Sequence, residues 1–396
     1  MALSFTIIGM SDAPSPNFSP EVLKVISSAK FFSGGKRHHT IVEPLLPKES
    51  RWVDITVPLE NVYKIYRDID SHIVVFASGD PLFFGFASTL KRVMPEVDMK
   101  VYPYFNSLQM LAHSVNLPYS DMHIVSLTGR EWKGLDNALI EHREKIGILT
   151  DREKTPDAVA KRMLEYGFDF YSMYVGEHLG NPSEQRLSHL SLQEASEKSF
   201  RHPNCLILTI KVNPPKRRFG IDESEFNLLN GRSRMITKMP IRLLTLQKLD
   251  LYNRRTFWDV GFCTGSVSIE ARLMFPHLDI FSFEIREEGR ELMESNSRKF
   301  SAPGINYTIG DFLTLDLNEK TDAAFIGGHG GKLKEIMERV YGYLTEGGCI
   351  VFNSVTMESK ETFIEAVNSL GMSLKEPTHI ELDNNNPIEI LKAVKE

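Results

Sequence analysis

The stretch FWDVGFCTGSVSIE, residues 257–270, carries three local signals in succession. The apolar run 257–260 is typical of a buried strand. Gly261 and Gly265 bound a short turn, and the residues from Ser266 onward suit a helix. Glycines let a backbone pass close to a ligand, and a helix N-terminus offers free N–H groups. The stretch therefore predicts a strand, a turn and a helix with a ligand at the turn.

Apolar runs downstream predict further strands at 280–283, 306–309, 323–326 and 349–355. A helix among them is indicated by apolar residues at helical spacing on one face, namely Leu333, Ile336, Met337, Val340 and Leu344. Alternation of strands and helices is typical of α/β layers.

Acidic residues follow the strands of this series. Glu284 ends the second predicted strand, where an acid can accept hydrogen bonds from ribose hydroxyls, and Asp311 follows the third. The ligand could be a dinucleotide or S-adenosylmethionine. The dinucleotide fingerprint requires a glycine where this chain has Cys263, whereas Asp259 before the turn suits an adenosine that carries an amino acid. The alternative is that the glycines only shape a turn and Glu284 is a solvated acid.

The N-terminal half begins a similar series, with strands predicted at 5–9, 72–77, 123–127, 145–150, 172–175 and 205–210. In TPDAVAKRMLEYG, Thr155 suits an N-cap, Pro156 a first helical residue and Gly167 a stop. Residues 211–225, KVNPPKRRFGIDESE, contain two prolines, a basic cluster and then an acidic cluster, and this composition predicts a linker. We therefore expect one domain over 1–212 and another over 213–396.

Composition sets limits on function. The chain has 396 residues, 42% hydrophobic and 25% charged, and a net charge of −6, which gives no reason to expect a nucleic-acid partner. Its three widely spaced cysteines form no CxxC metal site and indicate a reducing compartment. No apolar run approaches the roughly 20 residues of a membrane span. We expect a cytoplasmic protein that forms a homo-oligomer and holds no metal.

Several longer motifs resemble known families. ASGDPLFFGFASTL, FNSLQMLAHSVNLPYSDMHIVSLTGR, ILTDREKTPDAVAKRMLEYG and GEHLGNPSEQR resemble the tetrapyrrole methylase family, in particular its C5-methylating branch. RMITKMPIRLLTLQKL, WDVGFCTGSVSIEA, IGDF, FIGGHGGKL and LTEGGCIVFNSVT resemble the decarboxylating C15-methyltransferases. The resemblance implies an α/β fold, with a tetrapyrrole-methylase domain of two subdomains and a cleft, followed by a Rossmann-like methyltransferase domain.

The resemblance also implies a function in cobalamin biosynthesis. It implies two methyl transfers, to C5 and C15 of a polycarboxylate corrin precursor, loss of CO2 from the C12 acetate, and one S-adenosylmethionine site per domain. The implied first cofactor site comprises Gly79, Asp80, Phe83, Ser107 and Leu108. The implied second comprises Thr237, Gly261, Phe262, Cys263, Thr264, Gly265, Glu284 and Phe312. Candidate carboxylate contacts are Lys36, Arg37, His38, Arg130, Arg234, Lys238 and Arg242.

Two positions depart from the family patterns. The first strand of the N-terminal family usually ends in a GxGPG-like turn, whereas this chain has Gly9, Met10, Ser11 and Asp12. An alternative is therefore that one half methylates while the other only binds the tetrapyrrole. His329 stands where a small residue is usual, and it is a candidate proton donor, a carboxylate contact or a variable loop residue. A nicotinamide-dependent oxidoreductase is a further alternative. The Asp80–Pro81 pair also suits a plain helix start.

Overall fold

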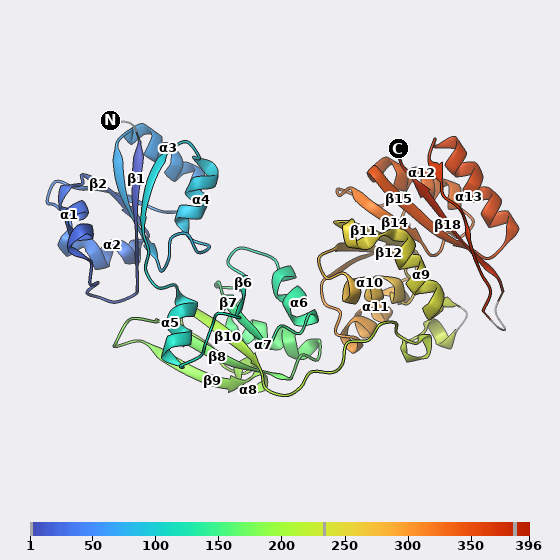
Figure 1. The fold of residues 1–396 in the computed structure, drawn as a ribbon, viewed down its shortest axis with the longest axis horizontal. Coiled ribbons are helices and arrows are strands. Elements are labelled where there is room, and N and C mark those ends of the chain that lie inside the picture. The colour runs from blue at the N-terminus through green and yellow to red at the C-terminus, as the bar shows by residue number, and fades with distance from the viewer. Residues whose placement is uncertain (1–2, 233–234, 383–385) are drawn as a thin grey trace. The chain divides into compact units, whose positions relative to one another are not determined.

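The computed structural model describes residues 3–232, 235–382 and 386–396. The chain forms two compact units, which we describe separately (Figure 1). The first comprises Met1–Glu131, Glu144–Lys161 and Phe170–Val212. The second comprises Asn213–Glu396 together with two short segments, Trp132–Arg143 and Arg162–Asp169.

The first sheet is parallel throughout, in the order β3-β2-β4-β1-β5. Its strands are β1 (Ser4–Met10), β2 (Phe31–Gly34), β3 (Arg51–Asp54), β4 (His72–Ser78) and β5 (Asp98–Tyr102). Its helices are α1 (Pro20–Ser28), α2 (Lys36–Val42), α3 (Leu59–Ile69) and α4 (Phe86–Val93), with the 3-10 helix η1 (Glu43–Leu45). Side chains alternate along the strands, so Phe5 and Ile73 belong to one core, whereas Ile8 and Phe76 belong to the other. Burial of both faces explains the continuous apolar runs of β1 and β4.

The second sheet is mixed, in the order β6-β7-β10-β8-β9. Its strands are β6 (His123–Ser126), β7 (Lys145–Leu149), β8 (Tyr171–Glu177), β9 (Arg186–Ser191) and β10 (Asn204–Ile210). The helices of this region are α5 (Ser107–Ser114), α6 (Lys133–Ile140), α7 (Pro156–Glu165) and α8 (Leu192–Ser196). Helix α5 packs on the sheet through Leu108 and Leu111, which share a core with Cys205 and Ile207 of β10.

The third sheet, in the second unit, has the order β13-β12-β11-β14-β15-β18-β16, and β17 pairs with β18. Its strands are β11 (Thr256–Val260), β12 (Asp279–Glu284), β13 (Ile305–Ile309), β14 (Thr321–Ile326), β15 (Leu344–Ser354), β16 (Ser373–Leu374), β17 (Thr378–Ile380) and β18 (Ile388–Val394). Its helices are α9 (Met239–Leu249), α10 (Ser266–Met274), α11 (Glu288–Lys299), α12 (Leu333–Tyr343) and α13 (Met357–Ser369), with the 3-10 helices η2 (Glu223–Glu225), η3 (Leu229–Gly231) and η5 (Leu251–Asn253).

The order of the third sheet creates a binding position. Five neighbouring strands of this sheet run parallel, namely β13, β12, β11, β14 and β15, and β18 is antiparallel to β15. Strand β11 lies between β12 and β14, so the chain reverses its direction of winding there. Open α/β sheets bind ligands at the carboxyl ends of strands beside such a switch point.

The structure confirms the predicted α/β class and each predicted strand, with ends that differ by a few residues. It also confirms Pro156 as the first residue of α7 and the buried face of α12. The strands that sequence reasoning missed include β2, β3, β5 and β9, which are short or partly exposed.

Among the helices of the described residues, none has the length and apolar character needed to cross a membrane.

Candidate functional site

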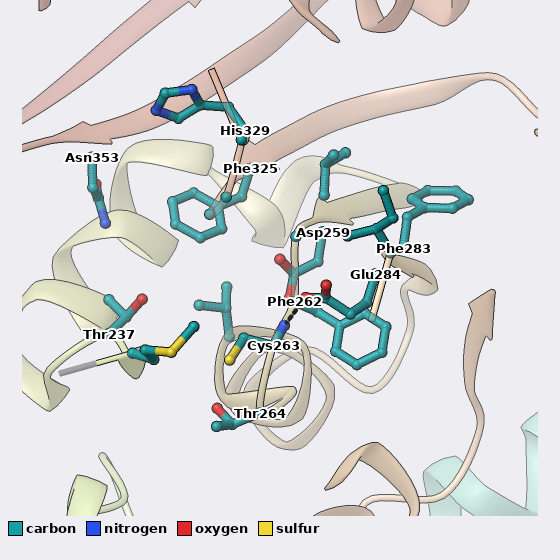
Figure 2. A pocket seen from close by; sticks show the side chains of 18 of the residues that line it. Thr237, Asp259, Phe262, Cys263, Thr264, Phe283, Glu284, Phe325, His329 and Asn353 are labelled. Atoms are coloured by element: carbon teal, nitrogen blue, oxygen red, sulfur yellow. Dashed lines mark hydrogen bonds between the residues drawn. The ribbon is translucent and has the colours of Figure 1, made fainter. Parts of the chain in front are cut away.

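The larger cavity, of about 820 Å³, lies in the second unit at the carboxyl ends of β11, β12 and β14. Figure 2 shows its side chains, with Thr237 and Asn353 on the left of the view and Phe262 and Glu284 on the right. Sequence reasoning named eight residues for this site, and all except Gly265 line the cavity: Thr237, Gly261, Phe262, Cys263, Thr264, Glu284 and Phe312. The structure therefore brings together residues that are up to 75 positions apart (237 to 312).

The glycine turn joins β11 to α10, and the position of Gly261 has no room for a larger residue. Gly261 has φ +78°, and a Cβ there would lie 2.5 Å from the backbone nitrogen of Gly328. Its own N–H donates to the carbonyl of Phe283 at 2.8 Å, which holds the turn against β12. Gly265 has φ +75° at the N-cap of α10, so it shapes the turn without lining the cavity. Both positions are in the left-handed region that favours glycine.

Glu284 is 3% exposed and ends β12 beside the turn. Its Oε2 accepts from the backbone N–H of Cys263 at 2.9 Å, and its Oε1 accepts from the backbone N–H of Arg286 at 3.0 Å. These bonds fix the carboxylate at the cavity wall (Figure 2). Each oxygen keeps accepting capacity for a hydroxyl of a ligand.

Asp259 is the penultimate residue of β11 and is 1% exposed. Ser268 donates to its Oδ2 at 2.5 Å, whereas its Oδ1 is buried and has no hydrogen-bond partner among the described residues. Burial raises the pKa of Asp259 to about 7, and the nearby charge of Glu284 adds to this rise. Because a buried, unpartnered carboxylate oxygen is costly, this lining residue fits a ligand with a positive charge or an N–H donor.

The apolar part of the cavity wall rests on the core of the sheet. Phe312 is 6% exposed, and its ring meets those of Trp258 and Phe283 edge to face at 5.9 and 5.1 Å between centroids. The core therefore holds the loop after β13 in place.

The basic candidates near this cavity differ in their surroundings. Arg242 was expected to contact substrate, but it is fully buried, pairs with Glu270 at 3.1 Å and donates to the carbonyls of Thr237 and Ile221. That expectation was wrong, because Arg242 satisfies buried groups of the protein itself. Lys238 lines the cavity and lies 3.2 Å from Glu223. Arg234 lies outside the described residues.

His329 lies in the loop after β14, where four glycines surround it: Gly327, Gly328, Gly330 and Gly331. It lines the cavity, and its Nδ1 accepts from the N–H of Gly331 at 3.2 Å. Its ring also meets that of Phe352 edge to face, and burial lowers the pKa of His329. The neutral ring therefore carries its hydrogen on Nε2.

Sequence reasoning missed other residues that line this cavity, including Met235, Ile236, Asn353 and Asn386. Asn353 exchanges hydrogen bonds with Thr245 on α9, with 2.9 Å between its Nδ2 and the hydroxyl oxygen. Asn353 lies inside β15 near its end, and Asn386 lies just before β18. No motif in the sequence marks either residue.

A smaller cavity, of about 140 Å³, lies in the first unit. It is lined by residues of both sheets of that unit, including Ser78 of β4 and Cys205 of β10. Of the residues expected at the first cofactor site, Gly79 and Ser107 line it. The others lie beside it: Asp80 accepts from the N–H of Leu82 at 2.9 Å, and Phe83 and Leu108 pack in the adjacent core.

The basic residues of the first unit that were expected to bind substrate also differ in their surroundings. Arg37 lines the small cavity and pairs with Asp12 at 3.1 Å, and His38 lies 2.9 Å from the hydroxyl of Ser78. Lys36 is exposed. Arg130 is exposed, donates to Ser126 at 2.5 Å and stacks over the ring of Phe84 at 5.1 Å. Asp12 also lies 3.0 Å from His178. The turn at residues 9–12, which differs from the family's GxGPG-like pattern, is therefore held by contacts of Asp12 on two sides.

Comparison with known proteins finds family models that match both halves of the chain. A family model described as tetrapyrrole (corrin/porphyrin) methylases matches residues 5–196, and one described as the precorrin methyltransferase domain matches residues 230–395. A probable cobalt-precorrin-6B C(15)-methyltransferase (decarboxylating) from Sulfolobus acidocaldarius is 33% identical, over 38% of this chain and 79% of the relative. The chain belongs to the precorrin methyltransferase family.

A longer relative of this precorrin methyltransferase carries both regions. A precorrin-6Y C(5,15)-methyltransferase [decarboxylating] from a Sinorhizobium species is 28% identical, over 93% of this chain and 89% of the relative. A crystal structure of a precorrin-6Y C5,15-methyltransferase from Geobacter metallireducens is 31% identical, covers 45% of this chain and 97% of that chain, and has a TM-score of 0.41. The protein is a methyltransferase, so the nicotinamide alternative no longer applies.

In this precorrin methyltransferase, the described residues contain no group of three or more His, Cys, Asp or Glu side chains arranged to hold a metal ion.

Proposed function

We propose that this chain uses S-adenosylmethionine to methylate C5 and C15 of precorrin-6B, or of its cobalt form. It also removes the C12 acetate carboxyl as CO2, which gives precorrin-8 in cobalamin biosynthesis. Residues 1–212 form the C5-methylating domain, and residues 213–396 form the C15-methylating and decarboxylating domain. The order of the two family matches supports this division.

One observation carries the proposal for the second domain. The glycine turn at Gly261, the oriented carboxylate of Glu284 and the unpartnered Oδ1 of Asp259 all border one large cavity. In this assignment Glu284 accepts from ribose hydroxyls, and Asp259 binds the positively charged amino-acid portion. The cofactor, when bound, supplies an electrophilic methyl group on a cationic sulfur. The glycine turn and the carboxylates of Glu284 and Asp259 therefore fit S-adenosylmethionine.

The chain's own residues contribute mainly by positioning. The ring carbons that accept methyl groups are enamine-like nucleophiles, so the reaction requires no strong protein base. Buried aromatic rings, including Phe262, Phe312 and Phe325, form part of the cavity wall. Holding two reactants in line can account for about 7–11 kcal/mol of a barrier.

His329 is the residue we assign to the acetate that is lost. Its Nδ1 accepts from the chain, so its Nε2–H is the donor that a substrate carboxylate, or a ring position that takes up a proton, would meet. Replacing His329 with alanine should slow CO2 loss more than C15 methylation. Separate quantification of released CO2 and methylated product tests this assignment, and equal effects on both would contradict it.

The first domain has a competing assignment. Its cavity is about 140 Å³, much smaller than the second cavity, and Asp12 and Arg37 pair at its edge. The alternative is that this half binds the tetrapyrrole without methylating it, and the small cavity would then hold no S-adenosylmethionine. In either assignment, we expect Arg37 to contact a carboxylate of the substrate.

Equilibrium binding of S-adenosylmethionine to the full chain tests the two-site proposal. We expect two sites by calorimetry, and one remaining site after Gly261→Ala. A single site in the unchanged protein would support the alternative that the first half is a binding module. The homo-oligomer, the cytoplasmic location and the absence of a nucleic-acid partner stay predictions, and sedimentation analysis would test the first of them.

A further inference from the structure

Two side chains approach the hydroxyl of Ser78 within hydrogen-bond distance at the edge of the smaller cavity. Ser78 ends β4 and lines that cavity. The Arg37 guanidinium donates to Ser78 Oγ at 2.9 Å, and His38 Nε2 lies 2.9 Å from the same oxygen. Two residues of the first turn of α2 thus converge on a single oxygen atom at the end of β4.

The direction of the His38 bond follows from the other ring nitrogen. The backbone N–H of Gly35 donates to His38 Nδ1 at 3.3 Å, so Nδ1 is an acceptor. Burial lowers the pKa of His38 to about 4, so the ring is neutral at physiological pH and carries its hydrogen on Nε2. His38 therefore donates to Ser78, and Ser78 Oγ accepts two hydrogen bonds.

Two accepted bonds use the acceptor capacity of a hydroxyl and leave its own hydrogen to be donated. No acceptor within the described residues receives that hydrogen. The neighbouring Arg37 keeps donors as well, because its Nε pairs with Asp12 and one Nη2 hydrogen reaches Ser78, whereas Nη1 has no partner in the described part of the chain. Hydroxyl and guanidinium donors therefore meet at the cavity edge.

Asp12 offsets the charge of Arg37 but leaves some of its N–H donors unused. Asp12 is 9% exposed, one of its oxygens faces Arg37, and the other faces His178 at 3.0 Å. Glu184 Oε2 lies 3.4 Å from the same nitrogen, His178 Nδ1. Both carboxylate oxygens of Asp12 are thus engaged within the protein, and they hold the guanidinium in a fixed position.

We propose that Arg37 and Ser78 form a carboxylate-binding corner of the smaller cavity, with His38 and Asp12 as positioning residues. A carboxylate can accept from the Ser78 hydroxyl and from a remaining N–H of Arg37 together, and a hydrogen bond between charged groups is stronger than a neutral one. The proposal rests on the proposed function, in which two ligands of the chain carry carboxylates. They are the acetate and propionate side chains of the tetrapyrrole and the amino-acid end of S-adenosylmethionine.

Binding to the full chain tests the corner. The protein carries Gly261→Ala to disable the second site, and precorrin-6B and S-adenosylmethionine are titrated separately. Ser78→Ala should raise the Kd of one of them about tenfold, because a charge-assisted hydrogen bond is lost. A rise for precorrin-6B assigns the corner to the substrate, and a rise for S-adenosylmethionine assigns it to the cofactor. Unchanged Kd values for both would overturn the proposal, whether or not C5 is methylated.

Two further variants test His38 as a positioning residue. His38→Gln keeps an N–H donor near the position of Nε2 and should stay within about twofold of the unchanged chain. His38→Leu removes the donor and should match the effect of Ser78→Ala. Equal losses in both His38 variants would contradict the assigned bond. Ser27→Ala is the matched control, because Ser27 is an exposed serine whose hydroxyl donates only to the carbonyl of Lys24.

Discussion

Asp259 shows how one residue can oppose stability and serve binding. Its carboxyl is buried with a free oxygen, and burial raises the pKa from an ordinary 3.8 to about 7. The folded protein therefore binds this proton more tightly than the unfolded chain. Between about pH 4 and pH 7 the free energy of unfolding falls as pH rises, and the loss is complete above pH 7.

Asp259→Asn removes this pH-dependent loss. Without cofactor, the variant should be more stable than the unchanged protein at pH 8, by up to about 4 kcal/mol, and the difference should shrink at pH 5. Its affinity for S-adenosylmethionine at the second site should fall at least tenfold. Urea unfolding at both pH values checks the first point, and calorimetry checks the second. A stability difference that does not depend on pH would contradict the assignment.

Gly261 makes a second residue-scale prediction. Gly261→Ala places a Cβ 2.5 Å from a backbone nitrogen at φ +78°, so we expect about 1–3 kcal/mol of destabilisation and loss of C15 methylation. Gly342→Ala is the matched control, because Gly342 is inside α12 with open space around it. That variant should gain about 0.5–1 kcal/mol. Similar effects in both variants, measured by thermal unfolding, would contradict the steric account.

Sequence reasoning succeeded at residues whose backbone is special and failed at residues defined by burial. The glycine turn and Glu284 stand out because their types and positions are tied to strand ends. Arg242 and Lys238 are four positions apart, and only the fold decides that the first is buried and the second borders the cavity. Asn353 depends on the approach of α9 to β15, which no local pattern indicates.

At the scale of elements, a buried ion pair between Arg242 and Glu270 ties helix α9 to helix α10. Glu270 accepts from Arg242, and its oxygens also accept from the backbone N–H groups of Gly220 and Ile221 at 3.2 and 3.1 Å. Arg242 in turn holds the carbonyl of Thr237, a residue of the cavity wall. Packing of α10 and the shape of the cavity are therefore coupled.

Glu270→Gln tests this coupling. The variant leaves Arg242 buried without a counter-charge, so we expect a loss of roughly 3–5 kcal/mol of stability and weaker cofactor binding at the second site. Glu225→Gln, which breaks the more exposed pair with Arg218, should cost at most about 1 kcal/mol. Chemical unfolding of the two variants gives the comparison. Equal losses would mean that burial of the pair does not matter.

Elements with continuous apolar runs were predictable, because strands buried on both faces need apolar residues at every position. Strands β3 and β9 expose much of their length, so their sequences, RWVD and RLSHLS, lack such runs. The bounds of β15 were only partly predicted, because its first residues, Leu344 to Gly347, lead in from the end of α12.

For the whole molecule, two cavities in two units allow each activity to be removed alone. A Cβ at Gly9 would overlap the carbonyl oxygen of Gly79, which borders the first cavity. Gly9→Ala should therefore abolish C5 methylation and leave C15 methylation and CO2 loss. Gly261→Ala should do the reverse. Loss of both activities from either variant, in protein that remains folded by circular dichroism, would contradict the division of labour.

The sequence indicated two halves and a cofactor in each, but it could not indicate that the cavities differ in size. It also could not indicate contacts that form only in the fold, such as those of Asp12 with Arg37 and His178. The GxGPG departure was visible in the sequence, whereas its structural consequence was not.

The most direct test of the account is the mass of the tetrapyrrole after the full chain acts on it with S-adenosylmethionine. Precorrin-6B and its cobalt form are offered separately. The account predicts the gain of two methyl groups and the loss of one CO2 with one of these substrates. No change in mass with either substrate, from protein shown to be folded, would contradict it.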